Sequence, residues 1–310
     1  MEPPLWAWIA LILGVPVLAA VDLFFFGRGD QKVSVRKAAV WSVGWIALGL
    51  SFAIVLGLTQ GSTAAGEYLS GYLIEWSLSI DNLFVFAVIF TYFMVPAGLQ
   101  PRVLMYGVLG ALVFRGIFIA IGAAALGAAG WVIYVFGAFL IFTAYRLATH
   151  HGEQVDPSNN ALLKIVRRWV PSTTEYDGHK VFTRRDGVRL ATPIFAVLLV
   201  VASTDVLFAI DSIPAIFAVT DEAFIVLAAN AFALMGLRAG YFVIVGALDR
   251  FQYLNYGLAT VLGLVGVKML LADVWHPPVY VTLGAVVVVL GTAVLASLWA
   301  TRNAGRAEAA

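Results

Sequence analysis

Long apolar segments separated by short polar connections follow one another along the whole chain. A helix needs about 20 apolar residues to cross a bilayer, and nine segments reach roughly that length. Their approximate bounds are 5–26, 38–59, 67–95, 103–126, 130–148, 191–219, 223–248, 254–273 and 278–300. The pattern predicts an all-α polytopic membrane protein with about nine transmembrane helices.

The first segment is preceded by "MEPPLW", which is acidic and contains two prolines. A cleaved signal peptide begins instead with a basic region. We therefore expect residues 5–26 to form a retained helix.

The composition excludes several classes of protein. Of the residues, 62% are hydrophobic and only 12% are charged, whereas soluble domains average about 25% charged residues. The absence of cysteine excludes disulfides, thiolate metal sites and thiol catalysis. The four histidines lie outside the apolar segments, which excludes an imidazole site within the membrane. A formal net charge of +1 gives no sign of a nucleic-acid partner.

Lysine and arginine residues lie on every second connection between the apolar segments. The basic connections contain residues 28–37, 102, 149–190, 250 and 302–306. Because cytoplasmic connections are the basic ones, we expect the N-terminus outside and the C-terminus in the cytoplasm. The long connection 149–190 is then cytoplasmic as well.

The connection 149–190 contains the only extramembrane structure that we expect. "NNALLKIVRRWV", residues 159–170, has an apolar and a basic face and predicts a short helix at the membrane surface. "KVFTRRDGVRLAT", residues 180–192, predicts a small hairpin that turns at Asp186 and Gly187. A solvated linker without a further role is an equally good interpretation of this connection.

Two apolar segments carry carboxylates in the same order. In "IEWSLSIDNLFVFAVIF", residues 74–90, Glu75 and Asp81 are six positions apart, and in "TDVLFAIDSIPAIFAVT", residues 204–220, Asp205 and Asp211 have the same spacing. Each is followed by a helix with an arginine and then by a helix that ends on a basic residue. These are Arg115 and Arg146 in the first case, and Arg238 and Lys268 in the second. An offset of three helices reverses direction, so the pattern predicts two inverted three-helix repeats, helices 3–5 and 6–8.

The repeat divides the chain into five parts. They are two N-terminal helices (1–66), the first repeat (67–148), the cytoplasmic connection (149–190), the inverted second repeat (191–273) and a last helix with a tail (274–310).

Each charged residue at the centre of a spanning helix raises the free energy of membrane insertion by about 2.5–3.5 kcal/mol. Carboxylates in these helices therefore need partners that offset this cost. One interpretation is internal ion pairing with Arg115, Arg238 and Lys268. Five acids, counting Asp22 in the first segment, would then face three bases and leave negative charge over. The other interpretation is a cation site that is filled or protonated in turn.

Helical geometry relates these polar residues to one another. On a straight helix Glu75 and Asp81 point about 240° apart. Asn82 shares a face with Glu75, and Ser212 shares a face with Asp205. Both first acids therefore have a neutral polar neighbour on their own helix.

Pro214 removes the backbone hydrogen bond to the carbonyl of Ile210, next to Asp211. An opened turn there would expose a carbonyl oxygen, as in the broken helices of ion-coupled transporters. Carboxylate, amide, hydroxyl and carbonyl oxygens suit hard divalent ions such as Mn²⁺, Ca²⁺ and Mg²⁺. After such an ion leaves, repulsion among the carboxylates favours proton uptake, so exchange of metal for protons is expected.

These motifs resemble the TerC/Alx family of integral membrane proteins, which is related to the LysE transporter superfamily. The resemblance rests on the two acidic stretches together with "LMGLRAGYF" and "YGLATVLGLVGVKML", and it extends over about residues 5 to 275. It implies Mn²⁺ export, with tellurium resistance as a historical name for the family. The metal-handling positions that it implies are Glu75, Asp81, Asn82, Asp205 and Asp211, with Asp22 as a further position. Ser212, next to Asp211, joins them as a candidate ligand. Ala202 departs from the glutamate that many relatives have there.

Two other classes can be weighed. An intramembrane aspartyl protease carries Gly-x-Gly-Asp, whereas Asp81 follows Ser-Ile and Asp211 follows Ala-Ile. A membrane scaffold or protein-insertion factor that acts through residues 149–190 stays open as the alternative. We expect a multi-pass protein of the bacterial inner membrane that is not an enzyme and has no cofactor. Its expected partners are a divalent cation, with Mn²⁺ foremost, and protons.

Overall fold

The computed structural model describes most of the chain, in seven ranges. They are residues 3–26, 34–149, 163–164, 170–185, 187–244, 253–274 and 277–307. The helices discussed below are α1 (Leu5–Phe26), α2 (Val35–Gln60), α3 (Ser62–Tyr92), α4 (Gln100–Ala128), α5 (Val132–Thr149), α7 (Pro193–Phe217), α8 (Ala223–Ile244), α9 (Leu254–Leu270) and α10 (Val279–Ala307).

Each apolar segment predicted from the sequence overlaps one of these helices. Within the described ranges, seven helices are long and apolar enough to cross a membrane. The other two are α3, which carries Glu75 and Asp81, and α9, which has 17 residues. The prediction of an all-α polytopic membrane protein is confirmed, while the number of spans stays a prediction.

Local sequence sets several helix ends. The side chain of Ser34 accepts a hydrogen bond from the backbone N–H of Lys37 and caps the start of α2. Gly61, with a φ of 94°, separates α2 from α3 in a conformation that favours glycine. Pro193 begins α7, where its missing N–H has no helical partner to lose.

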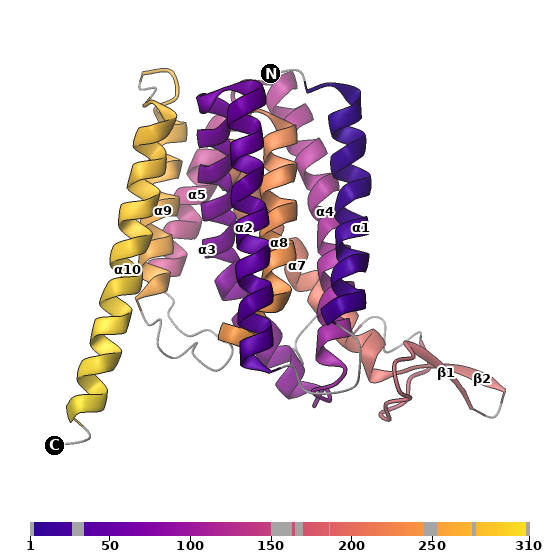
Figure 1. The fold of residues 1–310 in the computed structure, drawn as a ribbon. Helices are drawn as coiled ribbons and strands as arrows, with labels where there is room; N and C mark the ends of the chain where they lie inside the picture. Colours follow the sequence, from indigo (N-terminus) through magenta and orange to yellow (C-terminus); the bar gives the residue numbers. More distant parts are fainter. Residues whose placement is uncertain are drawn as a thin grey trace.

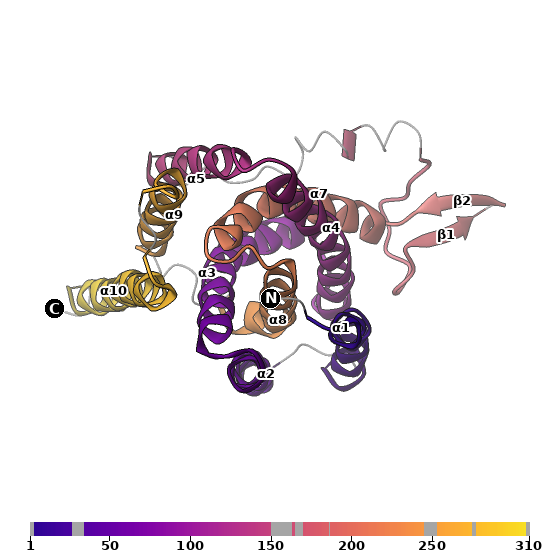
Figure 2. The same ribbon diagram turned by 90° about the horizontal axis from the view of Figure 1, so that it is seen from above.

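Helix α8 lies at the centre of the bundle. Figure 2 shows it surrounded by α1, α2, α3, α4 and α7. In its segment Ala223–Val243, 89% of the residues are buried, far more than in the other candidate spans. Polar side chains on α8 therefore face protein on nearly every side, and need partners within the bundle.

Helices α5, α9 and α10 form a peripheral group beside this core (Figure 2). Helix α5 packs along α9 so closely that a Cβ at Gly266 would lie 2.9 Å from the carbonyl oxygen of Gly137. A residue with a side chain at position 266 would push the two backbones apart.

Helices α3 and α7 run in opposite directions through the bundle. The start of α3 meets the end of α7, where the hydroxyl of Thr220 donates to Glu67 at 2.6 Å. The end of α3 meets the segment before α7, where the hydroxyl of Tyr176 donates to the carbonyl of Phe93 at 2.8 Å. Figure 1 shows the N-terminus at one end of the bundle, and the C-terminus and the β-hairpin at the other.

The most extensive contacts among the repeat helices form a symmetric set. Helix α3 packs against α8 just as α4 packs against α7, and the pairs α3–α7, α4–α8 and α5–α9 are also in contact. Exchanging α3, α4 and α5 with α7, α8 and α9 leaves this set of contacts unchanged. Superposition of the two units by a two-fold rotation stays a prediction.

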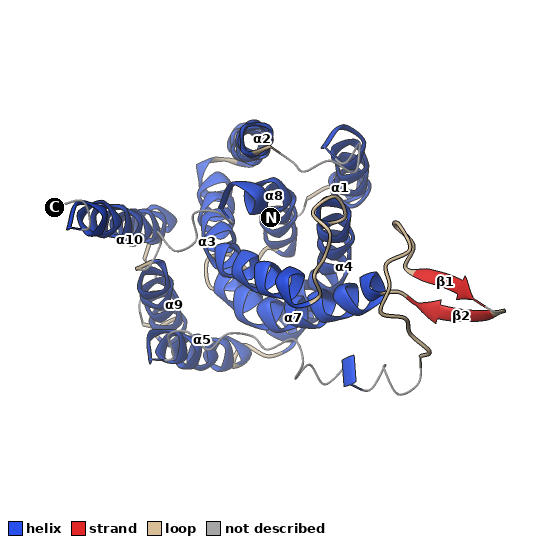
Figure 3. Ribbon diagram, turned by 90° about the horizontal axis from the view of Figure 1, so that it is seen from below, coloured by secondary structure: helices blue, strands red, loops and turns tan. Residues whose placement is uncertain are grey.

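The connection before α7 contains the predicted hairpin. Strands β1 (Phe182–Arg185) and β2 (Val188–Ala191) pair antiparallel, and Gly187 turns with a φ of 82°. The hairpin projects outward from the footprint of the bundle (Figure 3). This prediction is confirmed, whereas most of the surface helix expected at 159–170 lies outside the described residues.

Candidate functional site

The guanidinium of Arg115 is the centre of a buried polar cluster. Its Nη1 donates to Oε1 of Glu75 and, at 2.8 Å, to Oδ1 of Asn230. The same nitrogen lies 3.3 Å from the hydroxyl of Ser212. Nη2 and Nε contact the two oxygens of Asp205 at 3.3 and 3.5 Å, in the two-pronged arrangement typical of arginine and a carboxylate. The cluster therefore joins α3, α4, α7 and α8 near their centres.

The side chains of this cluster are nearly inaccessible, with at most 2% of each residue exposed. Ser79 donates a further hydrogen bond of 3.0 Å to Oε1 of Glu75. The other oxygen, Oε2, is buried and has no hydrogen-bond partner among the described residues. Two carboxylates thus share one guanidinium, so these three side chains carry a formal charge of −1. Oε2 of Glu75 can still accept a hydrogen bond.

Small residues bring α4 close enough to α7 for this contact. Gly107 and Gly122 lie on either side of Arg115 in the sequence of α4. A Cβ at these positions would lie 2.8 Å from Cγ1 of Val201 and 2.9 Å from Cε2 of Phe217. Close approach of backbones through small residues is typical of membrane helix pairs.

A second buried ion pair links α8 to α1 and α2. Arg238 of α8 donates to Oδ2 of Asp22 in α1, and Nε1 of Trp45 in α2 donates to Oδ1 at 3.1 Å. Asp22 and Arg238 are 2% and 1% exposed. The structure thus places Asp22 with Arg238 rather than with Glu75.

Buried acids and arginines therefore form ion pairs within the bundle. This agrees with the first of the two interpretations of the acids in the sequence. Among the described side chains, these pairs involve Arg115 with Glu75 and Asp205, and Arg238 with Asp22. Lys268, the third expected base, donates instead to the carbonyl of Ala218 at 2.9 Å.

The remaining predicted ligands are placed only in part. Asn82 is buried in α3 and is 4% exposed. Asp81 and Asp211 have described positions in α3 and α7, but their side chains lie outside the described part of the structure. Helix α7 continues past Pro214 to Phe217, so the chain is not unwound at the proline.

Asn230 was not among the residues singled out from the sequence. Its Nδ2 donates to the carbonyl of Val226 at 3.0 Å, which orients Oδ1 toward Arg115. It is the polar position in "AFIVLAANAFALMG", an otherwise apolar stretch of a helix. A lone amide in such a stretch has to form its hydrogen bonds within the bundle. This requirement could have identified Asn230 from the sequence.

The oxygen atoms around Arg115 match the requirements of a hard cation. The guanidinium of Arg115 is within hydrogen-bonding distance of four oxygen-bearing side chains. They are the carboxylates of Glu75 and Asp205, the amide of Asn230 and the hydroxyl of Ser212. Among the described side chains, no three acidic or histidine residues gather closely enough to hold a metal. The guanidinium of Arg115 lies at the centre of these oxygen atoms.

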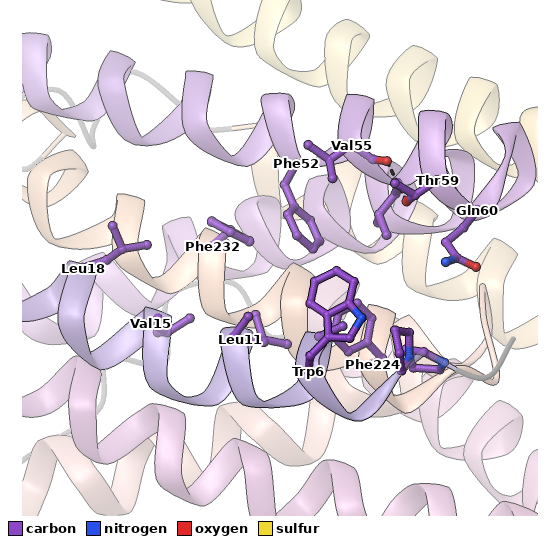
Figure 4. A pocket seen from close by; sticks show the side chains of 16 residues that line it. Trp6, Leu11, Val15, Leu18, Phe52, Val55, Thr59, Gln60, Phe224 and Phe232 are labelled. Carbon is purple, nitrogen blue, oxygen red and sulfur yellow. Dashed lines mark hydrogen bonds between the residues drawn. The ribbon is translucent and has the colours of Figure 1, made fainter.

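An apolar groove lies apart from this cluster, between α1, α2 and α8. Figure 4 shows α1 side chains such as Leu11 and Val15 facing Phe52 of α2 and Phe232 of α8. The groove encloses about 220 Å³ and is lined mainly by carbon. It offers few oxygen ligands, so it does not suit a metal ion.

Comparison with known proteins gives a consistent result over nearly the whole chain. The model of the family described as "Integral membrane protein TerC family" matches residues 60–305. An uncharacterised membrane protein of Myxococcus xanthus is 43% identical, covering 99% of this chain and 96% of its own. A protein of Escherichia coli K12 is 42% identical over 96% of this chain and 95% of its own, and is named as a candidate membrane-bound redox modulator, Alx.

A plant protein is also similar. The thylakoid membrane protein TERC of Arabidopsis thaliana is 42% identical over 80% of this chain and 65% of its own. No solved structure matches the chain.

Proposed function

Because the chain belongs to the TerC family of integral membrane proteins, we propose that it transports a hard divalent cation through the carboxylates around Arg115. Mn²⁺ is the cargo that the resemblance to this family implies, and export across the bacterial inner membrane is the direction that it implies. The cation is the substrate rather than a resident cofactor.

One observation carries this proposal. Glu75 and Asp205 hold equivalent places in two similar stretches of sequence, and they meet at one buried guanidinium in the middle of the bundle. Two carboxylates and one arginine leave a formal charge of −1 inside the membrane, where charge is costly. A purely structural ion pair would need only one of the two acids.

The ligand chemistry supports a particular class of ion. Carboxylate, amide and hydroxyl oxygens suit Mn²⁺, Mg²⁺ and Ca²⁺. The chain has no cysteine, so softer ions lose their usual thiolate ligands. For the same reason, thiol–disulfide chemistry cannot account for any redox effect of this chain.

Exchange for protons follows from the same charge count. When a divalent cation leaves, Arg115 neutralises one carboxylate and the second charge is left over. A proton taken up by this second carboxylate would complete the neutralisation, so we propose metal export coupled to proton entry. A scaffold role through the connection 149–190 needs none of these buried carboxylates.

Transport in proteoliposomes tests the proposal. The purified protein is reconstituted around a metal-sensitive dye, and entry of Mn²⁺, Mg²⁺ and Ca²⁺ is followed in separate experiments. Glu75→Gln and Asp205→Asn are expected to slow Mn²⁺ entry by more than about tenfold, because each removes a charged oxygen ligand. Asp177→Asn, which changes an acid of the hairpin region, serves as the control and keeps the normal rate.

Folding is monitored in the same preparations by size-exclusion chromatography and tryptophan fluorescence. Undiminished Mn²⁺ entry in well-folded Glu75→Gln/Asp205→Asn would refute the carboxylate site. Absence of metal entry in the unchanged protein, for all three ions, would favour the scaffold.

A further inference from the structure

The two faces of the β-hairpin differ in how their charges are paired. In the register of β1 and β2, Arg184 lies directly opposite Arg189, so the two side chains share a face. Arg185 points to the other face, because successive side chains of a strand alternate. Arg185 pairs with Glu175 at 2.6 Å. Neither Arg184 nor Arg189 has a carboxylate partner among the described side chains.

Two arginines directly opposite each other should weaken the hairpin. Like charges at such positions destabilise an antiparallel pair, and both side chains are exposed. Lys180, which precedes β1, has its own acid, since its ammonium lies 3.1 Å from the carboxylate of Asp177. Asp186, at the turn, lies outside the described residues. A repelling pair next to two balanced pairs indicates a face that an anion completes.

Local contacts orient both guanidiniums and leave N–H groups for a ligand. Nε of Arg184 donates to the carbonyl of Gly187 at 3.3 Å. The guanidinium of Arg189 lies over the ring of Phe182, 4.4 Å from its centre, and such stacking uses the face of the guanidinium rather than its N–H edge. The Nη groups of both arginines donate no hydrogen bond to the described residues. Planar N–H forks of this kind bind two oxygens of a phosphate at once.

An open hollow of about 540 Å³ lies beside the two arginines. Its lining is half basic side chains and half small or apolar ones, namely Asp177, Lys180, Phe182, Thr183, Arg184, Gly187 and Arg189. This volume is in the range of pockets that hold small molecules, about 300–1,000 Å³. A phosphate-bearing headgroup therefore fits beside the arginines.

The hairpin is bonded to the start of α7. Thr192, just before α7, donates through its hydroxyl to the carbonyl of Lys180 at 2.7 Å and through its N–H to the carbonyl of Val181 at 3.0 Å. The ring of Phe182 packs on that of Phe195 in α7, with centres 5.1 Å apart. Figures 1 and 3 show the strands extending sideways beyond the bundle, at the end opposite the N-terminus. Because lipid surrounds spanning helices, a segment in this position lies over the headgroups of the bilayer.

We propose that Arg184 and Arg189 bind the phosphate groups of anionic phospholipids in the cytoplasmic leaflet. The basic connections place the hairpin on the cytoplasmic side, and the negative surface potential of that leaflet complements the unpaired charge of this face. A soluble phosphate ligand has the same chemistry, but the place of the hairpin beyond the bundle favours a lipid. Through Thr192 and Phe195, this contact also holds the start of α7 at the membrane surface.

Hydrogen exchange of the hairpin amides tests the proposal on the full chain in lipid nanodiscs. One set of nanodiscs contains phosphatidylcholine alone, and the other contains equal parts of phosphatidylcholine and phosphatidylglycerol. Each basic residue near an anionic surface contributes about a fivefold factor to the equilibrium, so phosphatidylglycerol should slow exchange by about 25-fold in the unchanged protein. Arg184→Gln and Arg189→Gln should each retain a slowing of about fivefold. Arg184→Gln/Arg189→Gln should retain none.

Arg185→Gln is the matched control, because it removes the same charge one position away on the other face. It should keep nearly the whole effect of phosphatidylglycerol. A loss as large as in Arg184→Gln would assign the effect to overall charge and overturn the two-arginine site. Arg184→Lys/Arg189→Lys keeps the charges but not the planar forks and should keep only part of the effect. An undiminished effect in this variant would overturn phosphate binding by the forks.

The nanodiscs without anionic lipid test the repulsion between the arginines. Arg184→Gln should slow exchange there by about 1.4-fold to fivefold, because a like-charged cross-strand pair is removed. The same measurement shows that the variant hairpin is folded. Faster exchange would contradict the view that the two arginines repel each other in the absence of a ligand.

A last comparison separates a lipid from a soluble anion. Inorganic phosphate, added to phosphatidylcholine nanodiscs at the concentration of the phosphatidylglycerol, should leave exchange nearly unchanged. Slowing as strong as that by phosphatidylglycerol would replace the lipid by a soluble phosphate ligand. Equal exchange of the unchanged protein in the two kinds of nanodisc would overturn lipid binding outright.

Discussion

Replacement of Asp22 by asparagine isolates the energetic role of the second buried ion pair. Asparagine keeps the size of the side chain and an oxygen that can accept from Trp45, but it removes the charge that faces Arg238. Both charged residues are at most 2% exposed, so water cannot replace the lost partner. Breaking such a buried pair from one side costs about 3–5 kcal/mol.

Two further variants separate charge from hydrogen bonding. Trp45→Phe removes one hydrogen bond to a carboxylate and is expected to cost about 1.5–3 kcal/mol. Asp22→Asn/Arg238→Gln replaces both charges by amides, and should cost clearly less than the sum of the two single replacements, because both members of the ion pair are removed together.

Unfolding in mixed micelles with increasing sodium dodecyl sulfate, followed by tryptophan fluorescence, provides the free energies. A cost of Asp22→Asn below about 1 kcal/mol, the value of an ordinary neutral hydrogen bond, would show that the charge of Asp22 does not stabilise the fold. A double variant as costly as the sum of its single variants would refute the coupling of the two charges. Mn²⁺ transport measured on folded Asp22→Asn shows whether Asp22 has the metal-handling role suggested by the sequence.

Three other predictions follow from the packing and the hairpin. Gly107→Leu should destabilise the protein by about 1–3 kcal/mol, because its side chain overlaps Val201; the same unfolding assay measures this. Tyr68→Phe should cost about 1 kcal/mol, since it removes a buried hydrogen bond from the tyrosine hydroxyl to the carbonyl of Gly49 in α2. The hydroxyl of Thr183 holds the pKa of Asp177 below its usual value, so this stabilisation of the hairpin is complete above about pH 3.9 and is lost as the pH falls through the lowered pKa. Hydrogen exchange of hairpin amides against pH measures that loss, and Asp177→Asn should abolish the pH dependence.

The sequence predicts the helices well because a bilayer imposes one simple requirement on them. Long apolar segments have to be helical so that their backbone groups are satisfied internally. The hairpin was also predictable, because Gly187 supplies the positive φ that its turn needs. Helix ends were less accurate, and α3 begins at Ser62 rather than at 67 because only Gly61 interrupts the helical path from α2.

The candidate site was predictable as a list of residues but not as an arrangement. Charge and spacing identified Glu75, Asp205 and Arg115, because charges in apolar segments are conspicuous. Their meeting depends on how α3, α4 and α7 pack, which a single sequence does not specify. Asn230 was missed because a neutral amide stands out less than a charge, although it also has to be bonded in an apolar helix.

The pairing of Asp22 with Arg238 has a consequence for the order in which the protein is assembled. The two residues are 216 positions apart in the chain. At about 5–20 residues per second of synthesis, Arg238 follows Asp22 by roughly 10–40 s. During that interval α1 carries a carboxylate whose guanidinium partner has not been made. Helix α1 can therefore settle into its place only after α8 has been inserted, although α1 is synthesised well before α8.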